Sequence, residues 1–368
     1  MDEGNATTKD LDEVYWNIVH SDPRYRASTI IGKYVLFTLF VFGSIGNLLS
    51  FAVMVRRPMR SSSTAFYMAS LALADTTVMF IGCLRRWVIE VFQVDLLNYS
   101  PEACKAVNFF QYWSFDVAVW TLVAMTIDRA IVVIAPLKAY KHATRGRAAG
   151  VLTIIAVICA GINMHFFFTT TYVGQICTGD QEYRYFYEFI WPWVDATVYS
   201  FLPFTLLLVM NIIIIVSLSK ANARKRKMTN NFQQRKKSEQ RQGTISQKLT
   251  MMLLSVTSAF LLLTAPAVIL DILRGQGAPY FDLSKTNDMA LYILCRQIIR
   301  VLLYTNHSIN FFLYCVTGSK FRKELFFMLR CQSSTETDRR RSTIISMPNG
   351  SATNTGYVSS SPQRESSM

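Results

Sequence analysis

Long apolar stretches separated by short polar ones dominate the chain, and their length predicts helices that cross a membrane. About 20 mostly apolar residues are needed to span some 30 Å of hydrocarbon, and several segments reach that length. The first of them follows an acidic stretch, so we expect it to be a membrane helix rather than a signal peptide. The predicted spans are Ile30–Val55, Ala65–Phe92, Cys104–Ala135, Ala148–Thr169, Phe189–Leu218, Leu249–Leu273 and Met289–Val316.

The polar remainder of the chain predicts three further parts. Residues 1–29 form an N-terminal segment ahead of the transmembrane domain, which covers residues 30–316. Residues 317–330 carry apolar side chains at near-helical spacing with basic ones between, which predicts a short amphipathic helix in the membrane interface. Residues 331–368 are rich in Ser and Thr without a core pattern, which predicts a disordered cytoplasmic tail. The expected fold is an all-α, seven-helix membrane bundle.

The composition indicates a membrane protein, and the distribution of its basic residues predicts the orientation in the membrane. Of the 368 residues 51% are hydrophobic and only 17% are charged, although the net charge is +14; a soluble protein would be about 25% charged. The basic residues are segregated, since 24 of 38 follow the first, third, fifth and seventh spans. The positive-inside rule therefore predicts an extracellular N-terminus, in a multi-pass plasma-membrane protein.

Other sequence signals narrow the class of protein. Asn5 begins an Asn-X-Thr glycosylation acceptor on the expected outer side, whereas Pro101 disfavours use of a second acceptor at Asn98. Nucleic-acid binding is disfavoured because no aromatic residues interleave with the basic run at 224–227. An enzyme is disfavoured because no catalytic nucleophile or metal-ligand constellation is visible, and a transporter because no internal repeat or continuous polar path is visible.

Polar side chains inside the predicted spans indicate function, because they are costly in hydrocarbon. Their comparable depth predicts one internal network. The alternative is a set of purely structural interhelical hydrogen bonds, worth about 0.6 kcal/mol each. That alternative is disfavoured for Asp75, because a buried carboxylate must be paired, protonated or bound to a cation. The expected members of this network are Asn47, Asp75, Asn306 and Asn310.

An ordered set of motifs runs through the spans. These are GNLLS at Gly46–Ser50, LALAD at Leu71–Asp75, Asp128-Arg129, Pro203, Phe260 with Pro266, and NHSINFFLY at Asn306–Tyr314. Together they resemble the rhodopsin-like G-protein-coupled receptors over about residues 30–330. The last motif, with the Gly318-Ser319-Lys320-Phe321-Arg322 that follows it, resembles the invertebrate FMRFamide-type neuropeptide receptors in particular.

The resemblance implies roles for individual residues. Cys104 and Cys177 match the extracellular disulfide of the family, and Asp75 matches its sodium-binding carboxylate, with the network asparagines nearby. The other switch residues implied by the resemblance are Asp128, which holds Arg129 until the arginine is freed for the G protein, and Tyr314, which moves inward on activation. No other cofactor is expected.

Several positions depart from the family pattern. Ala130 follows Asp128-Arg129 where tyrosine is usual, Thr264 stands in place of the sixth-span tryptophan, and Phe311 replaces the seventh-span proline. Asn211 stands where the fifth span usually has tyrosine. The fold is expected to tolerate these changes, while the mechanism of the switch and its coupling to sodium stay open.

The ligand cavity of this fold lies between the outer halves of the spans. Gln111 replaces the aspartate that anchors small amines, and the seventh span has no lysine for a retinal Schiff base, so both subclasses are disfavoured. The remaining candidates are basic and aromatic, which suits peptide carbonyls and carboxylates. The alternative is that the arginines snorkel or pair with Asp271 or Glu90. The candidate cavity residues are Arg85, Arg86, Gln111, Trp191, Asp195, Tyr199, Asp271, Arg296, Arg300 and Tyr304.

The cytoplasmic side predicts partners of a signalling receptor. The basic third inner loop and the amphipathic helix are expected to meet a heterotrimeric G protein and anionic membrane lipid. Cys331 is a candidate palmitoylation site, with a free thiol as the alternative. Phosphorylation after the arginine run 339–341 would attract arrestin. The sequence thus predicts a non-catalytic receptor for an extracellular neuropeptide; the alternative ligand is a lipid or a small acidic metabolite.

Overall fold

The computed structural model describes residues 3–57, 59–60, 62–135, 143–229, 237–274 and 282–330, with their side chains except at 3–11, 221–249, 268 and 271–274. The chain divides into two compact units, Met1–Phe326 and Phe327–Met368. Only residues 327–330 of the second unit are described. The predicted tail and Cys331 lie outside the described residues.

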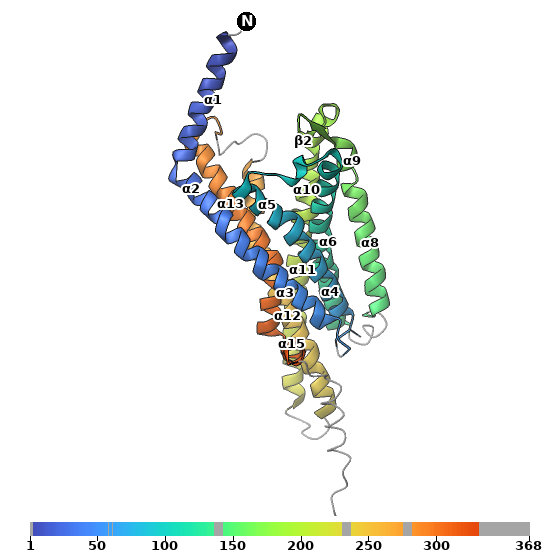
Figure 1. Cartoon of the computed structure of the whole chain (residues 1–368). Coiled ribbons are helices and arrows are strands. Elements are labelled where there is room, and N and C mark those ends of the chain that lie inside the picture. Colours follow the sequence, from blue (N-terminus) through green and yellow to red (C-terminus); the bar gives the residue numbers. More distant parts are fainter. Residues whose placement is uncertain are drawn as a thin grey trace, which may run out of the picture. The chain divides into compact units, whose positions relative to one another are not determined.

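The first four predicted spans are helical, and some contain short π-helical turns (Figure 1). Helix α1 (Glu3–Ser21) precedes the first span, which consists of α2 (Pro23–Ile30), a π-turn (Ile31–Val35) and α3 (Leu36–Met54). The second span consists of α4 (Ser63–Thr77), a π-turn (Val78–Leu84) and α5 (Arg85–Phe92). A 3₁₀ turn (Leu96–Asn98) leads to α6 (Pro101–Ile134), the third span, and α8 (Arg145–Asn163) with α9 (Phe166–Thr169) forms the fourth.

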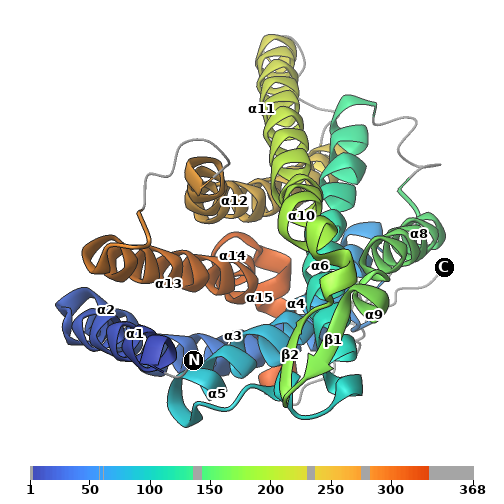
Figure 2. The ribbon, with the colours of Figure 1, turned by 90° about the horizontal axis from the view of Figure 1, so that it is seen from above.

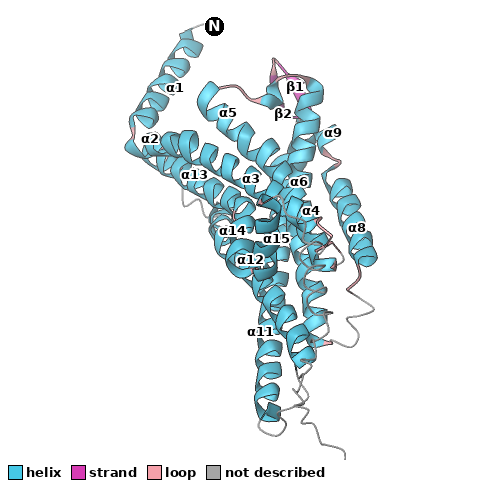
Figure 3. Ribbon diagram, turned by 60° about the horizontal axis from the view of Figure 1, so that its bottom comes forward, coloured by secondary structure: helices cyan, strands magenta, loops and turns pink. Residues whose placement is uncertain are grey.

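A two-stranded hairpin and three further spans complete the bundle. Strands β1 (Thr170–Val173) and β2 (Ile176–Gly179) pair antiparallel, with Tyr172 opposite Cys177, and Figure 3 shows them among helices. The fifth span begins with a 3₁₀ turn (Gln181–Tyr183) and a π-turn (Phe186–Ile190), and continues through α10 (Trp191–Asp195), a π-turn (Ala196–Phe201) and α11 (Leu202–Thr229). The remaining helices are α12 (Lys237–Arg274), α13 (Thr286–Ser308), α14 (Asn310–Thr317) and α15 (Ser319–Leu329).

Local sequence explains where several helices begin and break. Ser100 caps α6 by accepting a hydrogen bond from the Ala103 amide, with Pro101 at the first helical position. The fourth span breaks after Asn163, so it is shorter as a regular helix than the predicted Ala148–Thr169. The seventh span is interrupted at Ile309, between α13 and α14. Both breaks fall where polar residues interrupt the apolar run.

Six helices of the described chain are long and apolar enough to cross a membrane, and they coincide with the first six predicted spans. The seventh predicted span is helical as α13 and α14 but is less apolar, because α13 carries Arg296, Gln297, Arg300 and Asn306. These polar residues belong to the functional groups described below. The seven-helix arrangement expected from the sequence is therefore confirmed as a fold.

The helices pack into one bundle, seen end-on in Figure 2. Helix α6 contacts α4, α8 and α11, while α13 contacts α3 and α12 and so closes the bundle. Leu36, Met79 and Tyr304 belong to one core cluster, between the first, second and seventh spans. On the outside, apolar side chains such as Val157 and Leu262 are 65% and 75% exposed, as expected for surfaces that face lipid.

Candidate functional site

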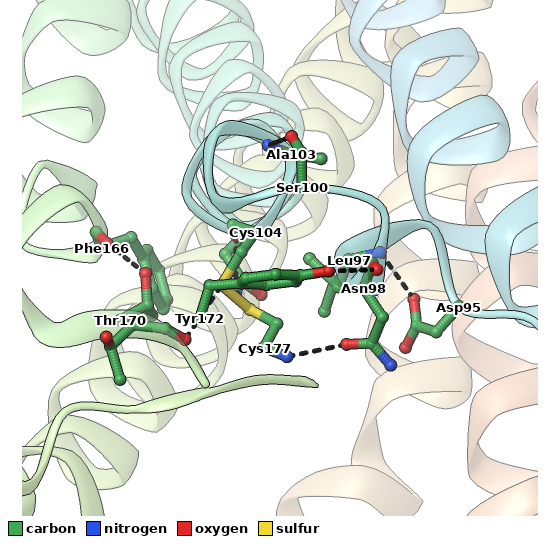
Figure 4. The surroundings of a disulfide bond; sticks show 12 residues. Asp95, Leu97, Asn98, Ser100, Ala103, Cys104, Phe166, Thr170, Tyr172 and Cys177 are labelled. Carbon is green, nitrogen blue, oxygen red and sulfur yellow. Dashed lines mark hydrogen bonds between the residues drawn. A yellow bond between two sulfur atoms is a disulfide. The ribbon is translucent and has the colours of Figure 1, made fainter. Parts of the chain in front are cut away.

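The disulfide predicted from the resemblance is present at the end of the bundle where α6 begins, which we call the outer end as predicted from the sequence; the opposite end is called the inner end. Cys104 at the start of α6 is bonded to Cys177 on β2 (Figure 4). The Cys177 amide donates to Asn98 Oδ1 at 2.8 Å, and the Tyr172 hydroxyl donates to the Asn98 carbonyl at 3.0 Å. Gly174 and Gln175 both have positive φ, which suits the two-residue turn of this hairpin. The Asn98 side chain therefore has a structural role.

Arg85 and Gln111, both predicted for the ligand cavity, are brought together with a residue that the sequence analysis missed. Arg85 donates to both carboxylate oxygens of Asp95 at 2.7 Å and to Gln111 Oε1 at 2.8 Å. Burial raises the pKa of Asp95, but the hydrogen bonds from Arg85 and the Leu97 amide outweigh it and hold that pKa below its usual value. We call Arg85, Asp95 and Gln111 the outer clamp, because they join α5, α6 and the loop between them.

A second group combines residues of α5 with residues of the outer half of α13. Arg300 donates to Gln297 Oε1, and Arg296 donates to the Tyr292 hydroxyl at 2.9 Å while it lies over the Tyr292 ring. Arg300 also interacts electrostatically with Arg86, Arg296 and Glu90. We call this group, with three arginines and one acid, the basic cluster: Arg86, Glu90, Arg296, Gln297 and Arg300.

Trp191 lies in an aromatic cluster formed by the third, fourth and fifth spans. Its ring is 3.9 Å from that of His165 and 5.8 Å from that of Tyr112, centroid to centroid, and Phe166 packs on both His165 and Tyr112. Tyr112 interacts electrostatically with Arg86 and Arg296, so the aromatic and basic clusters occupy one part of the bundle.

The inner polar network predicted from the sequence forms around Asp75. Asn310 Nδ2 donates to Asp75 Oδ2 at 2.7 Å, and Asn47 Nδ2 donates to the His307 carbonyl at 2.9 Å. The other carboxylate oxygen is 2.8 Å from His307 Nδ1, a partner that the sequence analysis did not single out. Asn306 is also buried, one residue before His307. We call Asn47, Asp75, His307 and Asn310 the inner network.

Two predicted cavity residues of the fifth and seventh spans lie next to this network. Tyr199 has its hydroxyl 3.4 Å from His307 Nε2 and its ring against Phe115. Tyr304 is 3% exposed and belongs to the core cluster with Leu36. Asp195 is half-buried on α10, one turn before Tyr199. Tyr199 therefore connects the outer part of the bundle to the inner network.

Of the predicted switch residues, Asp128 and Arg129 lie near the C-terminal end of α6 and Tyr314 lies on α14. Asp128 Oδ2 accepts from Arg129 at 2.6 Å, and Ser63 Oγ on α4 bonds to both side chains. Arg129 is 6% exposed. Tyr314 on α14 is 1% exposed, packs on Phe321 of α15, and its hydroxyl has no hydrogen-bond partner among the described residues.

Other polar pairs were missed by sequence reasoning. Asp116 in the third span is buried and accepts a hydrogen bond from Asn163 Nδ2 at 2.7 Å. An ionisable side chain is costly inside a membrane span, and this reasoning, which identified Asp75, applies equally to Asp116. Thr257 on α12 donates to Asn211 Oδ1 on α11 at 2.9 Å, which gives the departure at Asn211 a structural role. The side chains of Asn5 and Asp271, also predicted for function, lie outside the described residues.

Comparisons with known proteins agree with the fold and with these groups. The model of the family described as 7 transmembrane receptor (rhodopsin family) matches residues 46–314. The galanin receptor 2a of Danio rerio is 24% identical over 300 residues, which cover 81% of this chain and 78% of the relative. The sex peptide receptor of Drosophila melanogaster is 22% identical, covering 90% and 81% of the two chains.

A relative whose name indicates a different ligand class matches over a similar length. The G-protein coupled estrogen receptor 1 of Danio rerio is 23% identical over 321 residues, which cover 83% of this chain and 82% of the relative. The family match alone spans well over half of the chain. The chain therefore belongs to the rhodopsin-like family of G-protein-coupled receptors and is a multi-pass receptor of the plasma membrane.

Proposed function

We propose that this receptor binds an extracellular peptide and signals through a heterotrimeric G protein. The observation that carries the proposal is an excess of hydrogen-bond donors in the outer part of the bundle. The basic cluster contributes three guanidinium groups and the carboxylate of Glu90, while Asp195 lies near Tyr112 and Asp95 near Arg86. In addition, Gln297 Nε2 and Trp191 Nε1 are buried without an acceptor among the described residues. Buried donors are normally satisfied, so a ligand that brings several acceptors is needed.

A peptide fits this arrangement better than a ligand with one acidic group. The two unsatisfied donors lie on different helices, α10 and α13. Arg86 and Arg296 interact with Tyr112, which packs against Trp191. A peptide offers a carbonyl at every residue, and Tyr112, Trp191 and Phe166 offer aromatic contact area. Arg85 and Gln111 are engaged in the outer clamp, so we assign them a positioning role.

The proposed orientation places the N-terminus and the hairpin outside the cell. Disulfides persist in oxidising surroundings. Strand β2, which carries Cys177 of the disulfide, lies at the same end of the bundle as α1 (Figure 1). Asn5 would then be accessible for glycosylation. Arg129 and the basic loops are at the cytoplasmic end, where α15, with its basic and apolar residues, would meet membrane lipid and the phosphorylated tail would meet arrestin.

A lipid or a small acidic metabolite is the second candidate ligand. The name of the estrogen-receptor relative favours a lipid ligand. The arginines of the basic cluster would bind the carboxylate of an acidic metabolite. For such a ligand the donors of Trp191 and Gln297 would not both be satisfied by one acidic group.

The test is nucleotide exchange on a panel of G proteins by the reconstituted receptor, challenged with a neuropeptide library and with a panel of lipids and organic acids. We expect a peptide to stimulate exchange, and the Arg129→Ala receptor to bind that peptide without stimulating exchange. Stimulation by an acid or lipid alone would establish the second candidate. No stimulation by any peptide would overturn the proposal.

A further inference from the structure

The surroundings of Asp75 differ from those expected of a sodium site. The Asp75 side chain is buried, and each carboxylate oxygen has a nitrogen neighbour, His307 Nδ1 at 2.8 Å and Asn310 Nδ2 at 2.7 Å. Asn310 Nδ2 donates to Asp75. With Asp75 ionised, the state that a cation would bind, the carboxylate can only accept, so His307 Nδ1 also presents an N–H to it. The partners found at this carboxylate in the described chain are therefore donors.

A sodium ion needs the opposite arrangement. Hard cations are held by oxygen lone pairs of carboxylates, carbonyls, hydroxyls and water. The imidazole of His307 and the amide of Asn310 turn hydrogens toward Asp75, and a cation beside that carboxylate would face them. The two groups that contact Asp75 therefore do not fit the ion that the family resemblance implies, although Asn47 Oδ1 in the same network is a buried oxygen without a hydrogen-bond partner among the described residues.

The position of His307 is fixed from three sides. Asn47 on α3 donates to its backbone carbonyl at 2.9 Å, which is available because α13 ends at Ser308. The Phe115 ring meets the imidazole edge-on at 5.3 Å between centroids. The second ring nitrogen is 3.4 Å from the Tyr199 hydroxyl. The His307 side chain is consequently buried and held against the carboxylate, with Asp75 and His307 being 1% and 2% exposed.

We propose that the His307 side chain takes the place of sodium in this receptor. The imidazole supplies the hydrogen-bond donor that a buried carboxylate requires, and it links Asp75 on α4 to Tyr199 on the fifth span. The stability of the receptor is then independent of sodium. Removal of the imidazole leaves Asp75 with one of its two donors and opens space beside it, which creates a sodium site. This inference does not depend on the identity of the ligand.

The experiment compares thermal unfolding of the purified, ligand-free receptor in sodium chloride and in N-methylglucamine chloride at equal ionic strength. The wild type should unfold at the same temperature in both salts. His307→Ser should unfold at a lower temperature without sodium and recover by a few degrees with it, since an ion that binds only the folded state raises its stability. Adding Asp75→Asn to His307→Ser should abolish that recovery.

A matched control is His165→Ser. This variant removes a partly buried imidazole that lies away from Asp75, and its unfolding temperature should not respond to sodium. A wild-type unfolding temperature that rises with sodium as much as that of His307→Ser would overturn the proposal. So would a folded His307→Ser receptor without a sodium response. If His307→Ser does not fold, His307→Asn replaces it, and the wild-type comparison still decides whether the native receptor responds to sodium.

Discussion

Arg300 is the single residue that we expect to matter most for ligand binding. It is half-buried and interacts electrostatically with Arg86, Arg296 and the acidic Glu90. A hydrogen bond to a charged group contributes about 1.5–3 kcal/mol, so Arg300→Gln should weaken peptide binding about 10- to 100-fold. Radioligand competition measures this effect. Arg184→Gln, which breaks an exposed ion pair with Glu188, is the control and should bind normally; equal affinities for both variants would contradict the assignment.

Asp128 holds Arg129 in the observed conformation, with Ser63 bonded to both side chains. Asp128→Asn keeps the shape of the side chain but removes the charge of the acceptor. The population of receptors with Arg129 released should rise, and basal nucleotide exchange without ligand should increase several-fold. Ser63→Ala removes only the neutral partner and should give a smaller increase. Unchanged basal exchange in a folded Asp128→Asn receptor would show that this ion pair does not restrain the switch.

Helices α11 and α12 are joined by the bond between Thr257 and Asn211, both of which are buried. Thr257→Val keeps the side-chain volume and leaves Asn211 Oδ1 without this donor. This loss should lower the free energy of unfolding by about 1–3 kcal/mol. The unfolding temperature of the receptor should fall. The matched control is Thr126→Val, because the buried Thr126 hydroxyl bonds only to Leu122 within its own helix in the described contacts. An equal fall for the two variants would argue against a specific role of the interhelical bond.

The outer clamp gives the connection between α5 and α6 a defined pH dependence. Asp95 has a lowered pKa in the folded receptor, so the stability that it contributes is present above the usual aspartate pKa and is lost as the pH falls through the lowered value. The unfolding temperature of the wild type should therefore be higher than that of Asp95→Asn at neutral pH, and the difference between the two temperatures should shrink below about pH 4. The exposed variant Glu13→Gln should show no such difference. A difference that stays constant down to acid pH would contradict the role of the charged clamp.

For the whole molecule, the lengths of the apolar stretches were sufficient to predict the seven helices and their order, because hydrocarbon imposes a length on each span. The need of Asp75 for a partner was predictable as well, since it follows from burial of one carboxylate. That the partner is His307 was not, because the two residues are 232 positions apart and meet only where the seventh helix breaks after Ser308. The clamp was likewise hidden, because Asp95 reaches Arg85 through the fold of a short loop.

We propose that a ligand site at one end of the bundle and a G-protein site at the other share one conformational equilibrium. Binding free energies of two coupled sites are reciprocal, so the G protein must act on ligand affinity as the ligand acts on the G protein. The most direct measurement is the affinity of the activating ligand for the purified receptor with and without nucleotide-free G protein. We expect an affinity about 5- to 150-fold tighter with the G protein, and no tightening for Arg129→Ala. Equal wild-type affinities in the two conditions would contradict it.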